Sequence, residues 1–145
     1  MDFGRCKRTP EQDHTIALAG SATGGGIELA ISQDDAEMLV AAYGTAARIA
    51  KGGVARARSQ GLKVGMFRPK TLWPFPSKSL AALSRKVKRI LVFEMSTGQM
   101  VEDIQLAAQG RCDVVFYGRP GGVVSTPEEL ERVITSHYHK IASAA

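Results

Sequence analysis

The feature that most constrains the fold is a regular alternation of short apolar runs and longer amphipathic segments, which begins at Ala36. The apolar runs, each expected to form a strand, lie at 36–44, 62–67, 89–95 and 112–118. The amphipathic segments, each expected to form a helix, lie at 46–60, 77–87, 98–109 and 126–138. Strands and helices that alternate over short connections favour a parallel sheet with helices on both faces. We therefore expect a three-layer α/β/α domain with an open, mostly parallel sheet of four or five strands.

Several residues mark the expected helix ends. Gly61 follows the first helix and suits a left-handed cap. Ser77 is expected at the N-cap of the second helix. Thr126 is expected at the N-cap of the last helix, with Pro127 at its first position and Glu129 completing a capping box.

Residues 1–33 do not follow the alternating pattern. They contain the run GSATGGG at 20–26, which is typical of a flexible linker. The flanking runs at 15–20 and 27–32 are each compatible with a short strand. We therefore place one domain at 34–145 and interpret 1–33 as a linker, a tag or an extra strand.

The net charge of +5 is unevenly distributed. No acidic residue occurs between Glu37 and Glu94, whereas that span holds twelve Lys and Arg residues. Scattered basic residues usually form a solvated face, but such an excess also suits an acidic partner surface or nucleic acid. Nucleic acid is the weakest of the three interpretations, because the sequence has no helix-turn-helix signal.

The first expected helix carries four of these basic residues and two glycines. We expect the basic side chains to be exposed: Arg48, Lys51, Arg56 and Arg58. Ile49 and the glycine face are expected to be buried. Gly52 and Gly53 each cost about 1 kcal/mol relative to alanine inside a helix, and a close approach to the sheet or to a neighbouring element would explain them.

Composition excludes several classes of protein. No apolar run approaches the roughly 18 residues that a membrane helix needs, and the first residues carry no secretory signal, so we expect a cytoplasmic protein. Cys6 and Cys112 are the only cysteines, and an iron–sulfur cluster usually needs four. Cys112 is expected to be a buried, inert thiol. No metal site and no catalytic residue is predicted.

The carboxyl ends of the strands in an open α/β sheet are where ligands and partners collect. We expect eight residues near these ends to form one interface or anion-binding edge: Thr45, Arg68, Thr71, Trp73, Phe75, Glu94, Gln99 and Arg119. Helix N-termini and arginines together favour anions. Glu94 alone is more often a hydrogen-bonded structural or interface carboxylate than a general base.

The run RPKTLWPFP at 68–76 is the most unusual part of this edge, because it holds the only tryptophan and three of the six prolines. Prolines leave a loop with little entropy to lose on docking. Trp73 and Phe75 then suit a rigid apolar anchor for a partner. Packing of Trp73 into its own core is an equal alternative, and both hold if the ring is half-buried.

Three runs in order carry a resemblance to a known family: RPKTLWPFPSKSL, RILVFEMSTGQMVEDIQLA, and VVFYGRPGG followed by TPEEL. They resemble the C-terminal domain of the alpha chain of 2-oxoacid:ferredoxin oxidoreductases. The 2-ketoisovalerate and 2-oxoglutarate branches are the most similar, and the same module is the second domain of pyruvate:ferredoxin oxidoreductase. The resemblance covers 34–134 and implies a fold similar to the C-terminal domain of transketolase.

That family decarboxylates a 2-oxoacid on thiamine diphosphate with magnesium, transfers the acyl group to coenzyme A, and passes electrons through iron–sulfur clusters to ferredoxin. This sequence has no GDG-type thiamine diphosphate motif and no cysteine cluster. The resemblance therefore implies an accessory domain without a cofactor of its own and inactive alone. Its implied partners are a thiamine-binding beta chain, a gamma chain and a ferredoxin-like chain, and ferredoxin indirectly. The alternative is a stand-alone module that binds an anion or a nucleotide.

Overall fold

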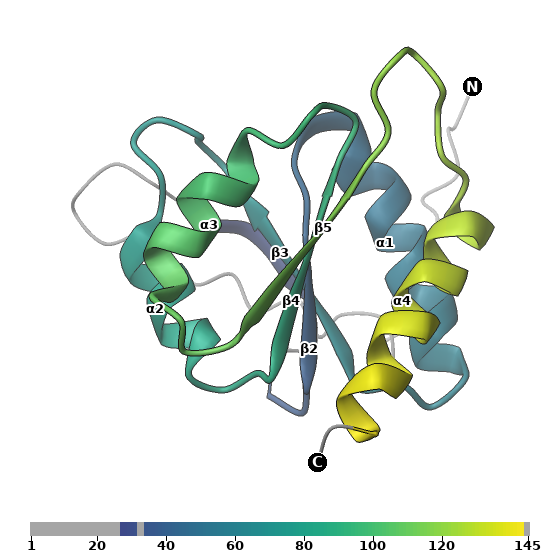
Figure 1. Cartoon of the computed structure of the whole chain (residues 1–145). Helices are drawn as coiled ribbons and strands as arrows, with labels where there is room; N and C mark the ends of the chain where they lie inside the picture. The colour runs from purple at the N-terminus through teal and green to yellow at the C-terminus, as the bar shows by residue number, and fades with distance from the viewer. Residues whose placement is uncertain (1–26, 32–33, 144–145) are drawn as a thin grey trace, which may run out of the picture.

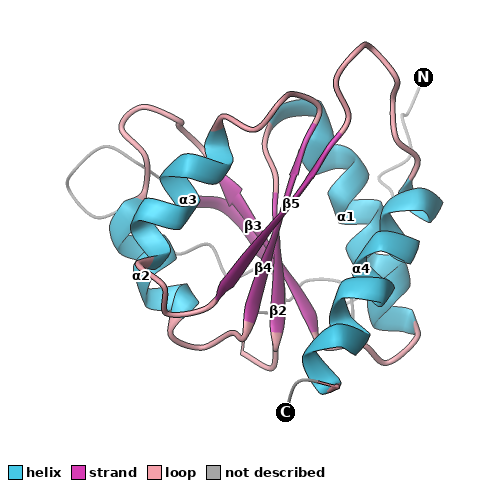
Figure 2. Cartoon of the chain, viewed as in Figure 1, coloured by secondary structure: helices cyan, strands magenta, loops and turns pink. Residues whose placement is uncertain are grey.

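The structure, a computed structural model, describes residues 27–31 and 34–143. These residues form one five-stranded sheet between two helical layers (Figure 1). The strands are β1 (Ile27–Ile31), β2 (Met38–Ala41), β3 (Val64–Pro69), β4 (Arg89–Glu94) and β5 (Asp113–Gly118). The helices are α1 (Gly44–Ser59), α2 (Ser77–Ser84), α3 (Met100–Ala108) and α4 (Pro127–Ala142). Figure 2 shows α1 and α4 on one face of the sheet and α2 and α3 on the other. The expected three-layer α/β/α architecture is confirmed.

The strand order is β1-β3-β2-β4-β5. The four strands of the alternating region are parallel, and β1 pairs antiparallel with β3. The fifth strand thus comes from the segment at 27–31, where the sequence allowed an extra strand. The linker expected at 20–26 and the strand considered at 15–20 lie outside the described residues.

Side chains of the strands alternate between two apolar cores, because successive residues of a strand point to opposite faces of the sheet. On β4, Leu91 and Phe93 pack under α1 and α4. Ile90 and Val92 pack under α2 and α3. All four side chains are fully buried, as expected for a strand covered on both faces. Strand β5 is different, because its residues are half-buried or exposed.

The expected ends of two helices are confirmed. Gly61 has a φ of +84° and donates its N–H to the Arg58 carbonyl, which closes α1. The hydroxyl of Thr126 accepts the N–H of Glu129 at 3.2 Å, and Pro127 is the first residue of α4. Local signals sufficed here because each cap involves residues close together in the chain.

One expected cap is wrong. Ser77 is the first residue of α2 rather than its N-cap, since the carbonyl of the buried Pro76 already accepts the N–H of Leu80. The expected capping box of α4 is present, because the carboxylate of Glu129 is hydrogen-bonded to the backbone of Thr126. The same carboxylate accepts a hydrogen bond from the hydroxyl of Tyr117 on β5 at 2.6 Å, so the start of α4 is also tied to a distant element.

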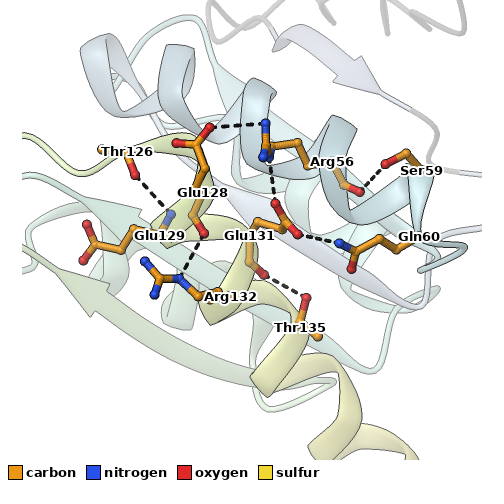
Figure 3. A network of polar contacts seen from close by, with 9 residues as sticks. All are labelled: Arg56, Ser59, Gln60, Thr126, Glu128, Glu129, Glu131, Arg132 and Thr135. Atoms are coloured by element: carbon orange, nitrogen blue, oxygen red, sulfur yellow. Dashed lines mark hydrogen bonds and ion pairs between the residues drawn. The ribbon is translucent and has the colours of Figure 1, made fainter.

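Helices α1 and α4 approach closely at the two glycines of α1, as the sequence predicts. A Cβ atom on Gly52 would lie 3.0 Å from Cβ of Pro127, and one on Gly53 would lie 3.3 Å from Leu130. Beside this contact, the Arg56 guanidinium binds Glu131 at 2.7 Å and Glu128 at 3.2 Å (Figure 3). The acidic side of α4 therefore neutralises part of the basic stretch of α1.

Candidate functional site

Four segments follow the carboxyl ends of the parallel strands, at 42–43, 70–76, 95–99 and 119–126. They lie at one end of the sheet, uppermost in Figure 1, and together form what we call the strand-end edge. All eight residues of the predicted edge lie in these segments or beside them. Parallel strands impose this arrangement, because every strand ends on the same side.

The loop after β3, residues 70–76, presents the largest exposed apolar side chain of the described chain. Trp73 is 92% exposed, and its neighbour Leu72 is 41% exposed. The expectation that the Trp73 ring packs into the core, wholly or by half, is therefore wrong. Tryptophan is normally highly buried, so a ring held almost entirely in water is the most unusual surface feature of the molecule.

The same loop is braced on both sides of Trp73. The Phe75 ring packs against Phe67 of β3, with ring centroids 6.4 Å apart, and Pro76 is buried. The Thr71 hydroxyl donates to the Pro74 carbonyl at 2.9 Å. Phe75 thus holds the loop in place, and of the two aromatic rings only Trp73 is presented outward.

At the end of β4, in contrast, the side chain of the predicted edge is buried. Glu94 is fully buried, and its carboxylate accepts the Ser96 hydroxyl at 2.8 Å. Three backbone N–H groups at the start of α3 also donate to it, from Gln99 at 3.0 Å, Met100 at 3.3 Å and Val101 at 3.0 Å. A carboxylate at a helix N-terminus satisfies donors that the helix leaves unpaired. Glu94 is a structural carboxylate, and the expectation that it faces an exposed edge is corrected.

The two arginines of the predicted edge start from strands that are not neighbours. Arg68 lies on β3 and Arg119 follows β5, and β2 and β4 run between those strands. Three strand spacings of about 4.8 Å place the two backbones roughly 14 Å apart. The order of the strands therefore separates the two residues along the edge, although both sit at the same end of the sheet.

Arg119 is already used within the fold. Its guanidinium binds the Glu129 carboxylate at 2.5 Å, on the same oxygen that Tyr117 contacts. The Tyr117 hydroxyl, and then the Arg119 charge, hold the pKa of Glu129 below its ordinary value. Arg119 thus ties β5 to α4, and half of its side chain remains exposed.

Thr45 and Gln99, the other two predicted residues of the strand-end edge, are exposed. Thr45 lies in the first turn of α1, where no side chain caps the helix and no acidic residue occurs. Gln99 precedes α3, and its own backbone N–H is taken by Glu94.

The sequence interpretation missed a second exposed apolar group at this edge. Val123 is 52% exposed and Val124 is 60% exposed, on the loop at 119–126. This loop projects beyond the sheet at the upper right of Figure 1. Gly121 and Gly122 have positive φ values of +91° and +76° and form its tip. The sequence does carry a signal for this exposed group, because two valines follow a Gly-Gly turn directly and lie outside any expected strand.

The basic side chains of α1 follow the prediction with one exception. Arg48, Lys51 and Arg56 are exposed and Ile49 is buried. Arg58 is half-buried, because it binds Asp35 at 2.9 Å and the Val64 carbonyl at 3.0 Å. Acidic residues of the domain itself therefore neutralise part of the basic stretch.

No group of three or more His, Cys, Asp and Glu side chains is arranged to hold a metal ion within 27–31 and 34–143. Cys112 is half-buried, less than expected, and burial raises the pKa of its thiol; Cys6 lies outside the described residues. Among the helices of the described segments, none combines the length and apolarity that crossing a membrane requires.

Comparison with known proteins gives relatives over most of the chain. Over 101 residues it is 43% identical to the ketoisovalerate oxidoreductase subunit VorB of Methanothermobacter thermautotrophicus, covering 69% of this chain and 28% of that subunit. Over 100 residues it is 36% identical to the 2-oxoglutarate synthase subunit KorA of Methanocaldococcus jannaschii, covering 69% of this chain and 27% of that subunit. The chain thus spans between a quarter and a third of the length of these curated relatives.

Solved structures share the fold. The 2-oxoglutarate:ferredoxin oxidoreductase from Magnetococcus marinus superposes with a TM-score of 0.64 at 23% identity, over 72% of this chain and 18% of that chain. A split-gene transketolase superposes with a TM-score of 0.60 at 12% identity, over 71% of this chain and 38% of that chain. The expected transketolase-like fold is confirmed. The family described as pyruvate:ferredoxin oxidoreductase core domain II matches residues 36–130, and the chain belongs to that family.

Proposed function

We propose that this domain is a non-catalytic positioning domain of a thiamine-diphosphate-dependent 2-oxoacid:ferredoxin oxidoreductase. It docks through its strand-end edge onto the domains or chains that carry the reaction. The relatives are subunits of ketoisovalerate and 2-oxoglutarate oxidoreductases, which supports the assignment to such a complex. The observation that carries the docking role is the 92% exposure of Trp73 on a braced loop.

The exposed ring is an unused source of binding free energy. Covering a tryptophan removes about 150–250 Å² from water, which corresponds to roughly 4–6 kcal/mol at about 25 cal/mol per Å². Only part of that appears as affinity, because association has its own entropic cost. The bracing by Phe75 and by the Thr71–Pro74 hydrogen bond keeps this cost low, since the loop is already ordered.

The described residues do not fit a thiamine diphosphate or magnesium site. Glu94 is a fully buried carboxylate, and four donors of the chain itself already occupy its oxygens. The proposal therefore places the cofactors in other domains or chains: a thiamine-binding beta chain, a gamma chain and a ferredoxin-like chain.

The docking role predicts a loss of assembly when Trp73 is truncated. Trp73→Ala should weaken binding to the proposed thiamine-binding partner chain by about 2 kcal/mol or more, roughly 30-fold. Isothermal titration calorimetry on the two purified chains measures this. Leu106→Ala is a matched control, because Leu106 is 74% exposed but lies in the last turn of α3, away from the edge. Equal affinities of the Trp73→Ala variant and the unaltered chain would contradict the proposal.

If the cofactors lie in other domains or chains, this chain alone should bind no thiamine diphosphate. Calorimetry with thiamine diphosphate and magnesium should show no binding in the micromolar range, and no 2-oxoacid should reduce a viologen dye in its presence. Magnesium-dependent micromolar binding would show that the domain carries a cofactor site after all.

A further inference from the structure

We propose that the surface that receives the Trp73 loop is a protein surface with an apolar pocket bordered by carboxylates, which pair with Lys70 and Lys78. This inference rests on the proposed docking role and adds the chemistry of the partner. Lys70 lies three residues before Trp73, and Lys78 lies five residues after it. Both lysines are exposed, so an apolar anchor is flanked on both sides by positive charge.

Half of the other ten cations of the acid-poor stretch form ion pairs inside the domain. Ion pairs with described acids are made by Arg56, Arg58, Lys63, Lys88 and Arg89. Lys70 and Lys78 make no ion pair within the described chain. The two charges beside Trp73 therefore remain available to a partner.

The acidic residues of α3 and of the end of β4 do not neutralise this loop. Glu102 and Asp103 lie in the first turn of α3, which packs beside α2, yet neither pairs with Lys78. Glu94 is buried and turned to the start of α3. These acids leave Lys70 and Lys78 open to carboxylates of a partner surface.

The spacing of the free cations favours a protein over nucleic acid or a membrane. Arg48 and Lys51 lie on α1, which covers the opposite face of the sheet from α2 (Figure 2). Arg85 and Lys86 follow the other end of α2, toward the start of β4. Binding to DNA typically neutralises 6–10 phosphates, and an anionic membrane is recognised by clusters of about 4–8 basic residues. Two lysines around one tryptophan are too few for either and suit a rim of carboxylates around an aromatic pocket.

Trp73 reports directly on its own surroundings, because it is the only tryptophan of the chain. Compared with free N-acetyltryptophanamide, the ratio of iodide to caesium quenching of its fluorescence should be raised, since the lysines attract the anion and repel the cation. Lys70→Glu combined with Lys78→Glu should lower this ratio below that of the free compound, whereas Arg85→Glu combined with Lys86→Glu should leave it unchanged. A ratio in the unaltered chain equal to that of the free compound would show that the loop carries no effective positive charge and would overturn the inference.

The decisive experiment measures binding of the same variants to the thiamine-binding chain at 50 and 300 mM NaCl. The Lys70→Glu/Lys78→Glu variant should bind at least tenfold more weakly at 50 mM, mostly through slower association, and the difference should shrink at 300 mM. The Arg85→Glu/Lys86→Glu control should bind as the unaltered chain does.

The outcomes separate this inference from the docking role. If Trp73→Ala weakens binding and the double lysine variant does not, the docking role stands and the acidic partner is wrong. Tighter binding of the double lysine variant would indicate a basic partner and would also overturn the inference. If neither variant changes binding, the proposed docking role itself fails. Lysine-dependent binding of the unaltered chain to a 30-base-pair duplex, or to phosphatidylserine vesicles, would assign the loop to another class of partner and refute the inference.

Discussion

Two segments of the strand-end edge differ in where they place their most notable side chains. The segment after β4 follows Glu94, a charged residue that is fully buried, whereas the loop after β3 carries Trp73, an apolar residue that is 92% exposed. Glu94 is buried because four donors of its own chain converge on it. Trp73 is exposed because Phe75 and Pro76 already fill the space beneath the loop. Burial at this edge follows from the partners each side chain finds, and polarity alone does not predict it.

The largest expected loss of stability comes from removing the buried carboxylate of Glu94. Glu94→Ala leaves the Ser96 hydroxyl and three N–H groups of α3 without their acceptor, so it should lower the free energy of unfolding by about 3–4 kcal/mol. Urea unfolding measures the change. Glu102→Ala is the control, because Glu102 is an exposed acid in the first turn of the same helix and should cost less than about 1 kcal/mol. Equal effects of the two variants would mean that the buried carboxylate is no more than a helix-dipole charge.

A smaller loss of stability is expected in the loop after β3, where two aromatic residues of the same loop can be compared. Phe75→Ala removes the half-buried ring that braces the loop and should cost about 2–3 kcal/mol, less than the 3–5 kcal/mol of a fully buried aromatic. Trp73→Ala, two residues away, should change the free energy of unfolding of the isolated chain by less than about 0.5 kcal/mol. Thermal unfolding of both variants tests the pair. A large loss of stability on truncating Trp73 would show that the ring packs against the domain and has nothing to offer a partner.

The smallest expected effect comes from pH and arises away from both segments. Burial, and then the charges of Lys140 and Arg89, lower the pKa of His137 on α4 below its ordinary 6.5; its Nδ1 is buried without a described hydrogen-bond partner. The folded state therefore disfavours the proton that the unfolded chain accepts. Stability should be complete above about pH 6.5 and fall modestly as the pH drops below it toward the folded-state pKa.

Urea midpoints at pH 7.5 and 5.5 check the pH effect, and His137→Gln should reduce it. The order of the Glu94→Ala and Trp73→Ala variants should be the same at both pH values, because His137 belongs to neither segment. An unaltered pH dependence in His137→Gln would assign it to other groups.

The parts of the fold that the sequence predicted correctly are those set by neighbours in the chain or by periodicity. The apolar runs predicted the four parallel strands, and Gly52 and Gly53 predicted a close helix contact. One error is local, because Pro76 and not Ser77 is the N-cap of α2. The other depends on elements brought together from afar. Arg68 and Arg119 were separated by the order of the strands, which a run of alternating strands and helices does not encode.

The candidate site follows the same division. Parallel strands guarantee that the predicted residues lie near one edge, so its location was predictable. Which side chains face outward was not, because it depends on what fills the layer beneath each loop. The two prolines and the phenylalanine around Trp73 indicated a stiff loop, yet only the packing of Phe75 on Phe67 decides which of the two aromatic rings stays in water.

The contact of α1 with α4 has a consequence for how the protein is made. Helix α1, with Gly52 and Gly53, is synthesised early in the described domain, and its partner α4 is the last helix of that domain to be synthesised. Leu130 and Ile134 of α4 are fully buried in the core that α1 shares, so that core stays open during translation of everything between them. Contacts between such distant parts of a chain form late and slowly, so the apolar side of α1 stays uncovered on the nascent domain until α4 emerges.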